Sequence, residues 1–146
     1  MTDDAIILRS AGDRDAGVVA SHLSDLGYPT EPSVIPQRLQ AIRREGGEIL
    51  LASDSAGAEL GLMSVARHVV LHGSGPVAYI TALVTSEAAR RRGVGRKLVE
   101  AAKKWAADEG CSRITVTSAE HRADAHAFYP SCGLPYTGRR FGASIA

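Results

Sequence analysis

The chain has 146 residues, of which 45% are hydrophobic and 23% charged, and its formal net charge is +1. This composition is typical of one ordinary soluble domain, so we expect residues 1–146 to form a single unit. The longest apolar runs fall far short of the roughly 20 residues needed to cross a bilayer, so no membrane role is expected. A near-neutral charge also argues against a dedicated nucleic-acid binder, which usually carries a basic excess.

The chain contains two cysteines, Cys111 and Cys132. A domain of this size buries enough surface to fold without disulfides or a metal. No secretory leader precedes Ala5, so we expect a reducing, cytoplasmic location, with pairing of the two thiols left open. The spacing of Cys and His residues does not match a metal-ligand pattern, and no metal is expected.

The N-terminal half is predicted to hold one strand, two helices and a hairpin. A short apolar strand covers residues 6–9, and a helix capped by Asp13 ends at Gly27. Apolar residues at helical spacing predict a second helix over residues 34–45. The segments 48–53 and 59–71 are rich in Ile, Leu, Val and Met around a turn, which predicts an antiparallel hairpin.

The C-terminal half alternates strands and helices. We predict strands over residues 77–85 and 113–117, a long helix over 93–109, a short helix over 123–129 and a last strand over 136–141. Consecutive strands followed by alternation with helices indicate an α+β or mixed α/β sheet with flanking helices.

A glycine pair opens the long helix directly after an arginine run. Gly93 and Gly95 lack Cβ atoms, so the backbone can turn sharply while the first helical amides point outward and need an acceptor. A pyrophosphate would accept those N–H bonds at the positive end of the helix dipole. The nearby counter-charges are Arg90, Arg91, Arg92 and Arg96.

Other phosphate motifs do not match this segment. Leu98 stands where a dinucleotide fingerprint needs its third glycine, and no Walker-type Gly-Lys-Ser/Thr follows. A plain helix start after a solvated arginine run is the structural alternative.

Residues 90–95 resemble the hallmark of the GCN5-related N-acetyltransferase (GNAT) family, [QR]-x-x-G-x-[GA] between a strand and a helix. Residues 79–85 look like that family's splayed fourth strand. Residues 125–129 with Gly133 and Leu134 look like its second cofactor-side motif. The resemblance spans about residues 6–141. It implies a mixed, mostly antiparallel sheet split into a V and flanked by about four helices.

The resemblance also implies that acetyl-CoA, as cosubstrate, lies in the opening of the V. The amides of Val94, Gly95 and Arg96 after Gly93 would hold the pyrophosphate, and Leu83 and Val84 would offer backbone groups to the pantetheine arm. The side chains that would serve the phosphates are Arg90, Arg91, Arg92 and Arg96. For Arg91 and Arg92, a solvated charge run is the alternative.

Tyr129 matches the family's tyrosine beside the cofactor sulfur. A phenol with a pKa near 10 is a reasonable acid for a departing thiolate, so we expect Tyr129 to protonate coenzyme A as the intermediate collapses. The alternative is that Tyr129 and Phe128 only pack against the sheet. Because Pro130 follows, Tyr129 is expected in the last helical turn or in a slightly altered pose.

The general base has no clear candidate. Many relatives carry a glutamate on the fourth strand, but residues 79–85 contain no carboxylate. Glu87, His68 and His72 are nearby in sequence, each with a surface or turn role as its alternative, and a water relay to one of them is equally open.

The sequence therefore predicts an acetyl-CoA-dependent N-acetyltransferase in which a primary amine attacks the thioester directly. A small-molecule amine is favoured over a protein Lys or N-terminus as acceptor. The missing strand carboxylate motivates one alternative, a noncatalytic acyl-CoA-binding regulatory module. A homodimer is common in the family, and we expect one here.

Overall fold

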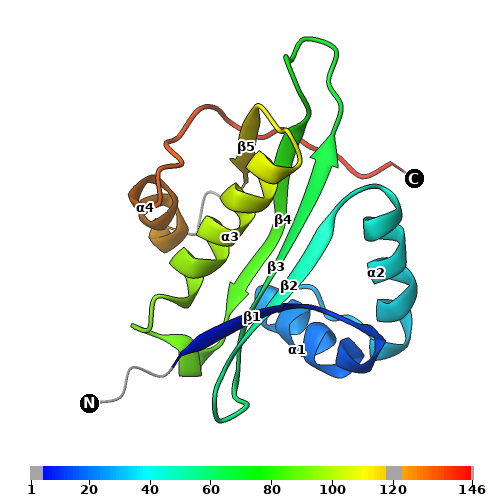
Figure 1. Ribbon diagram of the computed structural model, residues 1–146, viewed down its shortest axis with the longest axis vertical. Coiled ribbons are helices and arrows are strands. Elements are labelled where there is room, and N and C mark those ends of the chain that lie inside the picture. The colour runs from blue at the N-terminus through cyan, green and yellow to red at the C-terminus, as the bar shows by residue number, and fades with distance from the viewer. Residues whose placement is uncertain (1–4, 118–122, 146) are drawn as a thin grey trace.

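The computed structural model of the chain describes residues 5–117 and 123–145. Its centre is a five-stranded sheet with strand order β1-β2-β3-β4-β5 (Figure 1). The strands are β1 (Ile6–Ser10), β2 (Glu48–Asp54), β3 (Glu59–His68), β4 (Val77–Thr85) and β5 (Arg113–Val116). The first four pair antiparallel and β5 runs parallel to β4, so the sheet is mixed but mostly antiparallel, as predicted.

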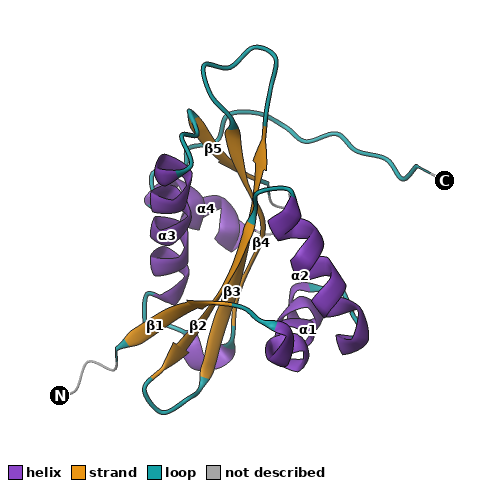
Figure 2. Ribbon diagram, turned by 45° about the vertical axis from the view of Figure 1, so that its right-hand side comes forward, coloured by secondary structure: helices purple, strands orange, loops and turns teal. Residues whose placement is uncertain are grey.

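Four helices flank the sheet: α1 (Ala16–Leu26), α2 (Ile35–Arg44), α3 (Val94–Asp108) and α4 (Ala123–Ser131). Helices α1 and α2 lie over one face and α3 over the other, with α4 beside α3 (Figure 2). Gly27 ends α1 with a φ of 111°, the left-handed conformation that a glycine allows after a helix. The predicted fold class is confirmed.

Each face of the sheet has its own apolar core. On the α3 side, Leu98 and Ala102 pack against Met63, Val65 and other buried strand residues. On the other side, α1 and α2 pack on Leu51, Leu62 and Val84. Because successive strand residues point to opposite faces, the strands supply both cores and hold the helices at fixed positions.

The sheet opens into a V between β4 and β5. The two strands pair only from Val77 to Ile80 of β4, although β4 continues to Thr85. The register between β3 and β4 also shifts at this point, because Ser64 pairs with Ala82 and Val65 with Ile80, which leaves Thr81 as an extra residue. Such a bulge bends and twists a strand, so β4 diverges from β5 at Thr81.

Two strand predictions are wrong, one in where the strand ends and one altogether. Strand β3 ends at His68 and not at residue 71, and Val69 and Leu71 are 81% and 105% exposed in the following loop. Residues 136–141 form no strand. The described backbone offers this segment no ladder partner, and it lies across a cavity from β5. Within it, Gly138 also weakens strand formation.

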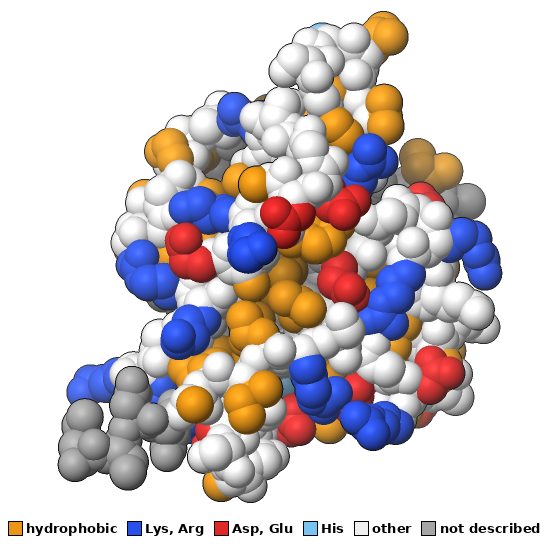
Figure 3. Space-filling view, in the orientation of Figure 1, with side chains coloured by type: hydrophobic (Ala, Val, Ile, Leu, Met, Phe, Trp, Pro, Cys, Tyr) orange, Lys and Arg blue, Asp and Glu red, His pale blue; other side chains and the backbone are white. Residues whose placement is uncertain are grey.

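Charges are mixed over the face shown in Figure 3. Blue Lys and Arg side chains are interspersed with red Asp and Glu side chains, while hydrophobic side chains gather along the middle. Among the described residues, no helix has the length and apolar character of a membrane span.

Candidate active site

A groove with a cavity of ≈ 790 Å³ follows the opening of the V. Its walls come from the end of α1, from β4 beyond the bulge, from the loop that leads into α3, and from β5 and α4. Segments far apart in sequence therefore meet around one elongated space. The predicted site residues that line it are Leu83, Val84, Arg90, Arg91, Gly93, Val94, Gly95, Arg96 and Tyr129.

The start of α3 forms the predicted cradle. Gly93 has a φ of +74°, and nothing lies within 4 Å of the position that a Cβ would take. A glycine is therefore favoured here because of the left-handed backbone and not because space is short. Arg91, two residues earlier, is also left-handed, with a φ of +63°. The N-cap residue makes no side-chain hydrogen bond to this helix, and Gly93, Val94, Gly95 and Arg96 line the groove, so the first amides have no cap as their acceptor.

The absence of a side chain at Gly95 also allows another helix to pack closely against α3. A Cβ at Gly95 would lie 3.1 Å from Cζ of Phe128, so the absence of a side chain lets α4 come close to the first turn of α3. Arg96 strengthens the same contact, because its guanidinium donates to the carbonyl and hydroxyl oxygens of Ser131 at 3.1 and 3.2 Å. The cradle and the helix that carries Tyr129 are thus joined directly.

Arg92 is the one predicted cofactor residue outside the groove lining. Its Nη1 atom donates to Oδ2 of Asp54 at 3.2 Å. Asp54 is 8% exposed, and its other oxygen accepts the N–H groups of Ala56 and Ala58 at 3.0 and 2.9 Å. Those backbone hydrogen bonds, Ala58 first, and the Arg92 bond hold the pKa of Asp54 below its usual value despite burial. Arg92 therefore ties the cradle to the β2–β3 turn.

The remaining arginines are more exposed. Arg90 makes a loose pair with Glu87, with 3.7 Å between Nη2 and Oε1. Arg91 is exposed and lines the groove. Unlike Arg90 and Arg96, Arg91 makes no ion pair or side-chain hydrogen bond with the other described residues, and its place in the groove lining is beside Gly93.

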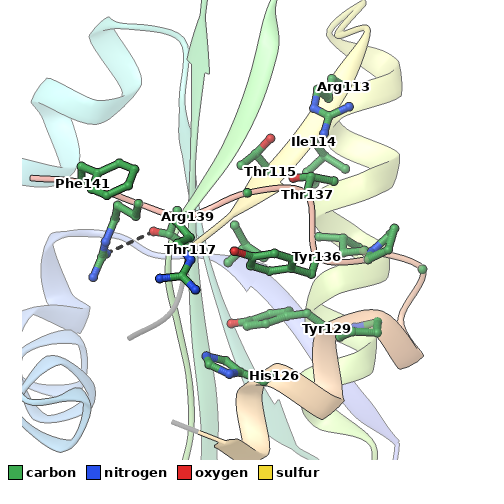
Figure 4. A pocket seen from close by; sticks show the side chains of 17 residues that line it. Arg113, Ile114, Thr115, Thr117, His126, Tyr129, Tyr136, Thr137, Arg139 and Phe141 are labelled. Atoms are coloured by element: carbon green, nitrogen blue, oxygen red, sulfur yellow. Dashed lines mark hydrogen bonds between the residues drawn. The ribbon is translucent and has the colours of Figure 1, made fainter. Parts of the chain in front are cut away.

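Tyr129 lies where two cavities meet. It lines the groove and also a second cavity between β5, α4 and the C-terminal segment. Its ring packs edge-on against Phe128, with 5.3 Å between ring centroids. Figure 4 shows its hydroxyl pointing away from α4, in the same direction as that of Tyr136. Helix α4 ends at Ser131, so Tyr129 is in the last turn, as predicted.

The candidate bases differ in position. His68 is at the exposed end of β3 and packs on Tyr79, with 5.0 Å between ring centroids. His72 is exposed in the β3–β4 loop, and neither histidine lines the groove. Glu87 does line it.

Two further residues line the groove: Asp25, which no sequence motif indicated, and Tyr28, which begins the connection between the first two predicted helices. Asp25 is in the last turn of α1 and Tyr28 is two residues beyond its end, and both are exposed and line the groove. His22, one turn earlier in α1, is only 4% exposed, and this burial lowers the pKa of its imidazole. The sequence signal for Asp25 is its position two residues before Gly27, where the first helix ends.

Comparison with known proteins identifies the class. The family model described as the acetyltransferase (GNAT) family matches residues 21–134. The uncharacterized N-acetyltransferase YhdJ of Bacillus subtilis is 30% identical over 107 residues, covering 73% of this chain and 75% of that protein. An aminoglycoside N(6′)-acetyltransferase type 1 of Serratia marcescens is 30% identical over 66 residues, 45% of each chain.

A solved aminoglycoside N-acetyltransferase in complex with CoA superposes with a TM-score of 0.83 at 15% identity, covering 97% of this chain and 95% of that one. This likeness concerns the fold. From the family match over residues 21–134, the chain belongs to the GNAT family of acetyltransferases, and the predicted enzyme class, an N-acetyltransferase, is confirmed.

Proposed function

We propose that this enzyme transfers the acetyl group of acetyl-CoA to a primary amine of a small molecule by direct attack on the thioester. The observation that carries the proposal is the single groove that joins the α3 cradle, the splayed part of β4 and Tyr129. Acetyl-CoA fits it, because uncapped helical amides and Arg91 suit a pyrophosphate at one end. Solved neighbours include complexes with CoA.

The reaction we propose is a simple acyl transfer. The neutral amine nitrogen forms a bond with the thioester carbon, and the C–S bond breaks as the tetrahedral intermediate collapses. The Tyr129 hydroxyl donates its proton to the departing thiolate. The proton released by the amine leaves through water in the groove, and Tyr129 regains its proton from solvent, so the products are an amide and coenzyme A.

Asp25 and Tyr28 support a cationic small molecule as acceptor. A carboxylate beside an aromatic ring favours an ammonium group, through a charge-assisted hydrogen bond and a cation–π contact. Both residues line the same groove as Tyr129. An acceptor with a second amino group could therefore be held at Asp25 while its neutral amine reacts. The aminoglycoside acetyltransferases among the relatives agree with this class.

The first test is calorimetric titration with acetyl-CoA. We expect Arg91→Glu to weaken binding by about tenfold or more, the equivalent of one lost charge-assisted contact. Lys97→Glu is the matched control, because Lys97 is an exposed cation in the first turn of α3 but outside the groove lining. Absence of binding in the parent protein would contradict the proposal.

The second test measures thiol release with a panel of diamines, polyamines, aminoglycosides and peptides. Asp25→Asn should raise KM for a diamine or aminoglycoside about tenfold and leave KM for acetyl-CoA unchanged. Glu31→Gln, at an exposed carboxylate outside the groove lining, is the control. Turnover with peptides alone would overturn the small-molecule acceptor and keep the transferase.

A further inference from the structure

His22 of α1 is a buried titratable group that the proposed reaction does not use. It is 4% exposed and lies one turn after Val19, on the face of α1 that packs in the core against the sheet. Its Nε2 atom is buried and has no hydrogen-bond partner among the described residues. Buried polar atoms in folded proteins are normally paired, so an unpaired imidazole nitrogen at this position calls for an explanation beyond packing.

A second unpaired polar atom is close to this imidazole. Glu59 is the first residue of β3, which α1 contacts, and its Oε1 atom is also buried without a partner in the described part of the chain. Of the neighbouring charges, that of Glu59 acts most strongly on His22. The charge of Glu59 also acts on Arg9 of β1, but the Arg9 guanidinium is held by Asp15 at 2.8 and 2.9 Å. The carboxylate of Glu59 and the imidazole of His22 therefore form one cluster beneath α1.

This cluster lies behind the wall of the groove. Asp25 is one turn after His22 on α1 and lines the groove, and its charge also acts on the imidazole. On the strand side, the hydroxyl of Ser86, another residue of the groove lining, donates to the carbonyl oxygen of Glu59 at 3.0 Å. Both members of the cluster are thus next to residues that face the groove. A change of charge at His22 would therefore change the electrostatic potential at Asp25.

The charge of His22 depends on a balance between burial and its acidic neighbours. Burial lowers the pKa of the imidazole, and the charges of Glu59 and then Asp25 oppose that shift. Arg43 of α2, the other helix on this face, is held in a pair with Glu48, and β4 carries no charged residue. The imidazole is therefore neutral at pH 7 and above, and it takes up a proton only in acidic solution.

We propose that His22 is a positioning residue for the acceptor, whose charge state sets how tightly the acceptor subsite, defined as Asp25 and Tyr28, holds an ammonium group. The neutral imidazole leaves the negative charge of Asp25 to the acceptor. The imidazolium would repel a bound ammonium group and balance the carboxylates of Asp25 and Glu59. This inference rests on the proposed function, because it needs an acceptor with a cationic group at Asp25.

Coulomb's law gives the size of this effect. A unit charge one helical turn away, in a partly solvated wall, changes the affinity for an ammonium group by about three- to tenfold. Thermodynamic linkage makes the coupling reciprocal, so a bound diamine must make His22 harder to protonate by the same factor. The midpoint of the His22 titration then falls by about 0.5–1 pH unit. A histidine that only fills space between α1 and β3 would show neither effect.

The test begins with calorimetry on the full chain saturated with coenzyme A. The probes are 1,4-diaminobutane and kanamycin, each titrated at pH 7.5 and pH 5. For each probe, the ratio of Kd at pH 5 to Kd at pH 7.5 should be about three- to tenfold larger in the parent than in His22→Gln. His72→Gln, at an exposed histidine outside the groove lining, is the matched control and should keep the ratio of the parent.

NMR of the His22 imidazole gives a second measurement that does not depend on a buried substitution. Saturating 1,4-diaminobutane should lower the midpoint of the His22 titration by about 0.5–1 pH unit. Asp25→Asn should lower the midpoint without any ligand, because the negative charge of Asp25 favours the protonated imidazole. Asp25 is exposed, so this variant keeps the fold even where His22→Gln does not.

The inference and the proposed function fail in different ways. Equal Kd ratios in the parent and in His22→Gln, with either probe bound, would overturn the role of His22 and leave the proposed function in place. A His22 midpoint that neither 1,4-diaminobutane nor Asp25→Asn changes would do the same. Failure of both probes to bind at pH 7.5, while coenzyme A binds, would overturn the acceptor with a second amino group and the role of His22 together.

Discussion

At the scale of single residues, the groove separates two chemical tasks. Tyr129 lies on α4 between the groove and the second cavity, while Asp25 is in the last turn of α1 and Tyr28 follows it. A phenol suits protonation of a leaving thiolate, and a carboxylate suits binding of a cation. Because the two groups come from different helices, substitutions should affect turnover and acceptor binding independently.

Tyr129→Phe should lower kcat by about 10²–10³, within the range for loss of a general acid, with KM for acetyl-CoA changed by less than about threefold. Steady-state kinetics from pH 6 to 10 measures this. Tyr136→Phe is the matched control, because Tyr136 lines the second cavity and its hydroxyl points the same way in Figure 4. An unchanged kcat for Tyr129→Phe, or equal losses in both variants, would assign Tyr129 a packing role.

At the scale of secondary-structure elements, the cradle depends on its neighbours. A Cβ at Gly61 of β3 would lie 2.9 Å from the carbonyl oxygen of Val84 and 3.1 Å from Leu98, so this glycine lets α3 sit close to the sheet. The Asp54–Arg92 pair then connects the loop before α3 to the β2–β3 turn. The position of the helix start therefore comes from two other strands as well as from its own residues.

Asp54→Asn should raise the Kd for acetyl-CoA by about five- to thirtyfold, because Arg92 loses its buried charged partner and the cradle loses an anchor. A double-mutant cycle with Arg92→Met, followed by calorimetry, should give a coupling energy of about 1–3 kcal/mol. Asp108→Asn breaks the exposed pair with Lys104 at the other end of α3 and should change Kd little. Additive effects of Asp54 and Arg92 would contradict the anchoring role.

At the scale of the whole molecule, a partly buried ion pair joins the first strand to the first helix. Asp15 is 6% exposed and accepts two hydrogen bonds from Arg9 of β1, at 2.8 and 2.9 Å, and one from the Gly12 amide at 2.8 Å. The hydrogen bonds from Arg9, more than any other contact, lower the pKa of Asp15 to about 2. The stability of the fold at low pH therefore depends in part on this contact with β1, an edge strand.

The lowered pKa of Asp15 determines how the stability of the fold changes with pH. The stabilisation is present above the unfolded value near 3.9 and is lost as pH falls from about 4 toward about 2. Asp15→Asn should reduce the free energy of unfolding by about 1–2 kcal/mol at pH 7, and the difference from the parent should shrink below pH 4. Urea titrations at pH 7, 5 and 3 measure it, with exposed Asp13→Asn as control. A constant difference across these pH values would contradict the ionic origin.

The sequence by itself determined the order and type of most elements, because they depend on local features. Alternation and helical spacing placed β4 over residues 77–85 and α3 within 93–109, and Gly27 marked the end of α1. The position of Gly93 directly before a helix indicated that the backbone needs a glycine there. The GNAT motif in residues 90–95 then indicated the family, since a phosphate cradle is itself a local structure of the chain.

Only the tertiary structure decided what depends on contacts between distant segments. Arg92 finds Asp54 across 38 residues and leaves the groove lining, while Asp25 reaches the groove because α1 lies over β4. Residues 136–141 were predicted as a strand and form none, because a strand exists only where another backbone supplies its hydrogen bonds. Local pattern states what a segment can form, and long-range packing and pairing determine which partner it meets and therefore what it does.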